Sequence, residues 1–221
     1  MMEDEKHPLT PFSIPEKKAY LCIVASLASA DREVSDDEIS NLRKLCKKVG
    51  LDARSMGEVL AAAEDPDSAP LQEYLKQMAE SELRFTLVTD MLFLAYADEK
   101  YSQDEREVVA RIALELKVNS EQLSAIENYV QAVTDMQKTG TSAEMKKLGG
   151  DVTAGLASAG IPIAAVAVSG TVWGLSTAGI VSGLLALGMG LGMATGVGVV
   201  AVLGVASYFG VRWLYRKMFN D

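Results

Sequence analysis

Residues 30–38 read ADREVSDDE, and residues 97–105 repeat this pattern sixty-seven positions later as ADEKYSQDE. In each passage a Ser stands three residues before a Glu, which is the capping box that begins many helices. Apolar residues at helical spacing precede and follow both passages. We therefore predict that each unit is a helix, an acidic turn and a second helix. Two such units cannot bury their apolar faces alone, so we expect them to share one core as an internal two-fold repeat.

The flanking sequence carries further helix signals of the same kind. Ser13 and Glu16 form another predicted capping box, and Asp52 is a candidate N-cap for a helix that ends near Asp65. No segment alternates apolar and polar residues as a strand would. The sequence predicts an all-α fold, with an acidic seven-helix domain over residues 13–138. A charged arm with two prolines, residues 1–12, is expected to be flexible.

The acidic turns are open to three interpretations. The first is helix capping alone, since a cap stabilises a helix by about 1 kcal/mol. The second is a metal site shared between the two turns, and the third is an acidic surface for a protein partner. An EF-hand loop is excluded because it needs Gly at position 6 and Glu at position 12. This chain has Asp36 and Leu42 there in the first copy, and Gln103 and Val109 in the second.

An Ala-Asp-x-x-apolar-Ser-x-x-Glu turn that occurs twice in an acidic helical domain resembles the TerB-like tellurite-resistance family. The resemblance covers about residues 15–135. The family usually has Gly directly after the Asp, where this chain has Arg32 and Glu99. The resemblance implies a non-enzymatic module of bacterial stress-response and membrane-associated systems. It also implies binding of a divalent cation such as calcium through the acidic positions, which here are Asp31, Glu38, Asp98 and Glu105.

Charge and residue types exclude several classes of function for the front domain. Of 30 acidic residues only Asp151 and Asp221 follow Gly149, so residues 1–148 are strongly acidic, which disfavours nucleic acid as a partner. The single histidine, His7, lies in the expected arm, and triad or histidine-base chemistry therefore lacks its usual residue. We therefore expect that the chain is not an enzyme. Cys22 and Cys46 lie in apolar helical patterns and are predicted to be buried thiols.

The last third of the chain has a different character, because residues 152–211 contain no Asp, Glu, Lys, Arg or His. A membrane-spanning helix needs about 20 mainly apolar residues. We therefore predict a linker over 139–160 and a Gly-rich transmembrane helical hairpin over 161–217, with spans at about 161–187 and 193–215. Basic and aromatic residues at the second end suit a membrane interface: Arg212, Trp213, Tyr215, Arg216 and Lys217.

Glycines in this run recur at four-residue spacing, which lets helices approach closely in lipid. The residues concerned are Gly170, Gly174, Gly179, Gly183, Gly188, Gly192 and Gly196. One interpretation is packing within a single hairpin; the other is a homo-oligomer formed through this glycine zipper.

The leading functional hypothesis is a protein of the bacterial inner membrane with both ends in the cytoplasm, because basic residues flank the hairpin and the acidic N-terminus is no signal peptide. Its helical domain would sense a signal or bind a partner, and its hairpin would anchor it in the bilayer and self-associate. The alternative is a membrane-perforating or membrane-remodelling effector whose hairpin is the active part and whose helical domain regulates it. A third hypothesis is a soluble protein that shelters the hairpin until a signal releases it.

Overall fold

The computed structural model describes residues 7–31, 33–96, 102–139, 142–169 and 208–219. All regular elements in these ranges are helices, and no strand occurs among the described residues, which confirms the predicted all-α class. The helices are α1 (Ile14–Asp31), α2 (Asp36–Lys48), α3 (Ala53–Glu64), α4 (Leu71–Glu80), α5 (Leu83–Tyr96), α6 (Gln103–Glu115), α7 (Ser120–Thr139), α8 (Ser142–Ser158), α9 (Ile163–Ala167) and α11 (Tyr208–Phe219).

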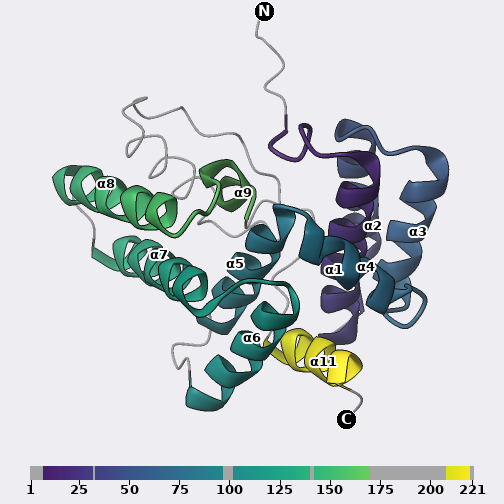
Figure 1. The fold of residues 1–221 in the computed structure, drawn as a ribbon. Coiled ribbons are helices and arrows are strands. Elements are labelled where there is room, and N and C mark those ends of the chain that lie inside the picture. Colours follow the sequence, from purple (N-terminus) through teal and green to yellow (C-terminus); the bar gives the residue numbers. More distant parts are fainter. Residues whose placement is uncertain (1–6, 32, 97–101, 140–141, 170–207, 220–221) are drawn as a thin grey trace, which may run out of the picture.

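Two helices form the centre of the fold, α1 and α5 (Figure 1). α5 is buried on every side except near its ends, which explains why its sequence has almost no polar face. α1 packs against α3, α4, α5 and α11, while α5 also contacts α6, α7 and α9. The hydroxyl of Tyr20 donates a hydrogen bond of 2.5 Å to Asp90 Oδ2, which joins the two central helices inside the core.

The predicted capping boxes explain where three of the helices begin. Ser35 and Glu38 cap α2 reciprocally, and Ser102 and Glu105 do the same for α6. The Ser13 amide donates to Glu16 Oε2 over 2.9 Å at the start of α1. These predictions are confirmed, because a capping box depends only on residues three positions apart.

The structure at the two ends of the helical domain differs from the predicted arm over 1–12 and the predicted linker over 139–160. Residues 7–12 form a turn that packs on the core, where Leu9 has no exposed surface and Phe12 contacts the apolar cluster. The expected linker, 139–160, instead holds α8, which lies along α7 (Figure 1). Apolar side chains such as Leu9 and Leu156 account for both differences, since each is fully buried against neighbouring helices.

The expected hairpin is only partly within the described residues. Its zipper glycines, from Gly170 to Gly196, all lie outside them. Among the helices that the structure does describe, none combines the length and the hydropathy needed to cross a bilayer. The two described ends of this stretch, residues 161–169 and α11, both pack on the helical domain.

Candidate functional site

The two acidic turns place their glutamates in helix caps. The Ser35 hydroxyl donates to Glu38 Oε2 over 2.8 Å, and the Ser102 amide donates to Glu105 Oε2 over 2.7 Å. Asp98 and the side chain of Asp31 lie outside the described part of the structure. Within the described residues, no three His, Cys, Asp or Glu side chains are grouped so that they could hold a metal. The predicted divalent-cation site therefore stays a prediction.

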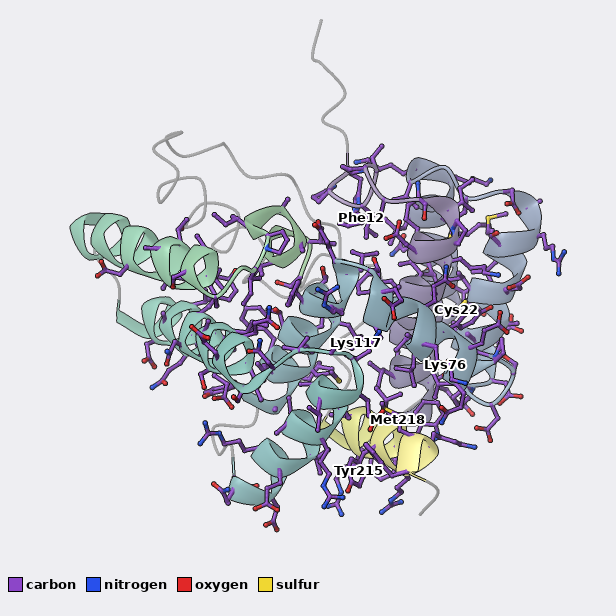
Figure 2. All side chains as sticks on the ribbon, in the orientation of Figure 1. Phe12, Cys22, Lys76, Lys117, Tyr215 and Met218 are labelled. Carbon is purple, nitrogen blue, oxygen red and sulfur yellow. The ribbon has the colours of Figure 1, made fainter. Side chains whose placement is uncertain are left out.

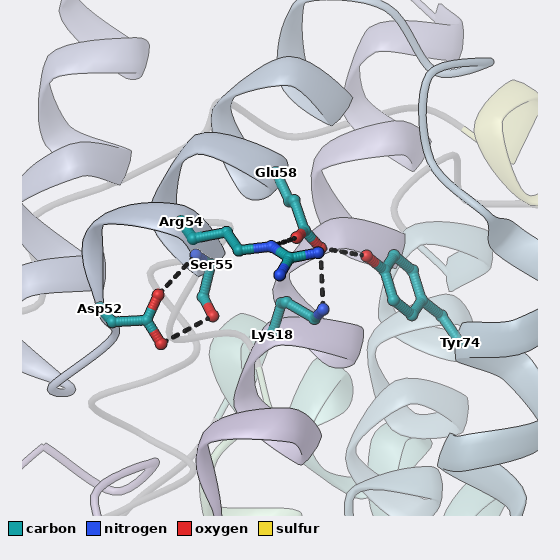
Figure 3. A network of polar contacts seen from close by, with 6 residues as sticks. All are labelled: Lys18, Asp52, Arg54, Ser55, Glu58 and Tyr74. Carbon is teal, nitrogen blue, oxygen red and sulfur yellow. Dashed lines mark hydrogen bonds and ion pairs between the residues drawn. The ribbon is translucent and has the colours of Figure 1, made fainter.

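A polar network that sequence reasoning missed lies between α1, α3 and α4 (Figure 3). Its centre is the Glu58 carboxylate, which accepts hydrogen bonds from Lys18 Nζ over 2.7 Å and from the Tyr74 hydroxyl over 2.8 Å. Arg54 Nε donates to the other oxygen of the same carboxylate over 3.3 Å. The network borders an open cleft of about 350 Å³. One carboxylate thus ties three helices together at the edge of a solvent-filled cleft.

The protonation states of this network follow from its contacts. Hydrogen bonds from Lys18 and then Tyr74 lower the pKa of Glu58, so that its carboxylate is charged at neutral pH. Burial, and then the hydrogen bond to Glu58, raises the pKa of Tyr74 well above its usual value. Burial likewise raises the pKa of Cys22 to about 12. The network thus places two cations, Lys18 and Arg54, around one carboxylate, and the Tyr74 phenol and the nearby Cys22 thiol stay protonated at neutral pH.

Glu58→Gln tests the contribution of this carboxylate through pH. Because the pKa of Glu58 is lowered by folding, its stabilising effect is full above the unfolded pKa and is lost as pH falls through the folded pKa. We expect the substitution to lower the free energy of unfolding at pH 7 by less than about 1 kcal/mol, since the group is partly exposed. The difference between variant and wild type should shrink at pH 3, as measured by urea unfolding. A difference that grows on acidification would contradict this assignment.

The second candidate site is the groove that α11 fills against α1, α5 and α6. Val211 and Leu214 are fully buried in it, and Trp213, Tyr215 and Met218 pack at its edge (Figure 2 labels Tyr215 and Met218). A Cβ at Gly210 would lie 2.4 Å from the carbonyl oxygen of Leu27, so only glycine permits this approach. α11 is therefore fitted closely to the domain.

Polar contacts surround the apolar centre of this groove. Arg111 Nη1 donates to the Tyr215 hydroxyl over 3.1 Å, and Lys217 Nζ lies 2.8 Å from Asp67 Oδ1. The Gln72 side chain donates to the Lys217 carbonyl oxygen over 2.9 Å. Of the residues predicted for a membrane interface, Arg212, Arg216 and Lys217 are exposed, although Lys217 also pairs with Asp67. The structure brings the other two, Trp213 and Tyr215, against the helical domain.

The other end of the uncharged run is fixed in a similar way. Ile161, Val166 and Val168 are buried, and α9 packs on α5. The Thr86 hydroxyl, inside the core on α5, donates to the Ala165 carbonyl oxygen over 2.6 Å. Both described ends of the run are thus anchored on the same helical domain.

Residues 17–128 match the family described as "Tellurite resistance protein TerB". This range begins in α1 and ends in α7, and it covers about half of the chain. The chain belongs to the TerB family. No curated protein and no solved structure shows significant similarity to it. The polar network of Glu58 lies inside the TerB range, whereas α8, α9 and α11 lie beyond it.

Proposed function

We propose that this TerB-family chain is a non-enzymatic membrane protein. Its helical domain binds a protein partner or senses a stress signal in the bacterial cytoplasm, and its uncharged run enters the inner membrane. One observation carries the proposal: the TerB-family helices hold both described ends of a sixty-residue run without charged side chains. A signal that alters these helices would act directly on the position of the run.

The composition of the run supports lipid as its surroundings. Helices of soluble domains need a polar face for water, and residues 170–207 offer only Ser, Thr, the indole N–H of Trp173 and glycine backbone for that purpose. A bilayer core suits such a sequence, because moving each apolar side chain from water into hydrocarbon lowers the free energy. The four-residue glycine spacing supports self-association of the inserted run as part of the same proposal.

The polar cleft at Glu58 is the feature of the domain best suited to a protein partner. It presents Lys18, Arg54 and Glu58 side chains of both signs next to the apolar surfaces of Ala69 and Pro70. A partner segment with an acidic side chain could compete with Glu58 for Lys18 and Arg54. Charge-assisted hydrogen bonds of this kind give specificity to a small surface.

Flotation of the full chain with phospholipid vesicles tests the proposal. We expect the protein to float with vesicles of mixed zwitterionic and anionic lipid, and to remain bound after a carbonate wash. Protein that stays at the bottom of the gradient, or that carbonate removes, would refute integral insertion. The same vesicles, loaded with a dye, separate two modes of action: retained dye supports anchoring, whereas released dye supports the membrane-perforating alternative.

A further inference from the structure

The docked ends leave a limited length of chain for crossing a membrane. Between Ser169 and Tyr208 lie thirty-eight residues. As continuous helix they would extend about 57 Å at 1.5 Å per residue. Two crossings of a core about 30 Å thick need about 60 Å, and a turn between them needs further residues. A complete hairpin must therefore draw residues from at least one docked end.

The two ends do not have equal ties to the helical domain. Residues 161–169 continue from α8 and contribute a backbone carbonyl to the core, where Thr86 donates to Ala165. The backbone bond described for α11, from the Gln72 side chain to the Lys217 carbonyl oxygen, lies instead on the exposed surface, and α11 contacts its groove through side chains and the Gly210 approach. In addition, residues 208–215 of α11 would form the final turns of a second span that ends near Tyr215. The same residues cannot lie in the groove and in the bilayer at once.

We propose that α11 is a latch: in the groove between α1, α5 and α6 it holds the end of the uncharged run on the TerB domain, and it leaves that groove before the run can cross a bilayer twice. This inference rests on the proposed function, since it assigns α11 a regulatory part in membrane insertion. Gly210 sets the fit of the latch, because any side chain there meets the backbone of Leu27. Departure of α11 would also uncover the apolar surface that Val211 and Leu214 occupy.

Gly210→Leu in the full chain tests the latch, because the added side chain obstructs the packing of α11 in its groove. Moving the Leu27 backbone inside α1 costs free energy. Overpacking of this kind is enough to change the equilibrium between docked and undocked α11 about tenfold. We expect amide hydrogen exchange in α11 to accelerate while α1 and α5 stay protected. We also expect half-maximal binding to mixed zwitterionic and anionic vesicles at about tenfold less lipid. Gly155→Leu is the matched control, because it adds the same side chain to the same run where nothing lies within 4 Å.

The outcomes distinguish failure of the latch from failure of the proposed function. Faster exchange in α11 with unchanged vesicle binding, in a wild type that binds vesicles, overturns the latch alone. Absence of vesicle binding in the wild type and in Gly210→Leu overturns both proposals. Leu214→Ala is a second way to loosen the helix, because it empties a buried position without adding bulk. Unchanged exchange of α11 in both variants would show that these contacts do not hold it, and would also overturn the latch.

Discussion

Replacing Leu175 and Val200 by Lys is expected to release the protein from lipid vesicles. Each position lies in the uncharged run, one in each of the two predicted spans. A Lys near the centre of a span disfavours insertion by about 2.5–3.5 kcal/mol, which corresponds to roughly a hundredfold in partitioning. The measurement is the floating fraction of the full chain over a series of lipid concentrations.

The control for this pair is Leu175→Ala with Val200→Ala, which keeps both positions apolar. We expect the control to float almost as well as the wild type, because Ala is tolerated in a span. Vesicle binding by the Lys variant equal to that of the control would mean that the run stays outside the hydrocarbon core. That result would contradict insertion while leaving the membership of the TerB family untouched.

Phe85→Ala is expected to lower the free energy of unfolding by about 3–5 kcal/mol. Phe85 lies on the central helix α5 with 1% of its surface exposed, so its removal leaves a cavity that close-packed neighbours fill only in part. Thermal unfolding should show the loss as a decrease in Tm of about 2–4 °C per kcal/mol for a chain of this size. The guanidinium of Arg84, 4.3 Å from the ring centroid, loses its aromatic contact as well.

Phe209→Ala provides the same chemical change at an exposed site. Phe209 is 53% exposed on α11, and we expect its removal to change the free energy of unfolding by no more than about 0.5 kcal/mol. Equal losses for the two variants would mean that α5 does not form the centre of the core.

The helices of the TerB domain could be predicted because their signals are local. Ser35 and Glu38 are three residues apart, so one short passage contains both partners of the capping box. The apolar spacing of α2 and α4 likewise indicates which side faces inward, and on that side Leu42, Leu45, Tyr74 and Leu75 are buried. α5 and the second half of α1 depart from this simple pattern, because they are buried almost all round.

The Glu58 network could not be predicted, because its members come from different helices. Lys18 and Glu58 are forty positions apart, and Tyr74 follows sixteen positions later, with no repeating pattern to connect them. Two adjacent lysines at the start of the apolar sequence of α1, Lys17 and Lys18, were the available signal. The partner of Lys18 could be found only from the packing of α1 against α3 and α4.

The docking of α11 was hidden for a different reason. Its aromatic and basic residues suit a membrane interface and a surface helix equally well, since both need an apolar face and a charged edge. Gly210 carried no signal in the sequence, yet its place in the structure is set by the carbonyl of Leu27. The linker predicted over 139–160 contains Gly150, which instead lies within α8.

The most direct test of the central claim is amide hydrogen exchange of residues 170–207 in the full chain, with and without phospholipid vesicles. Insertion into the hydrocarbon core excludes water and hydrogen-bonds the backbone internally. The account predicts that these amides exchange far more slowly when vesicles are present, while α1 and α5 exchange as before. Identical exchange of residues 170–207 in the two conditions would contradict it.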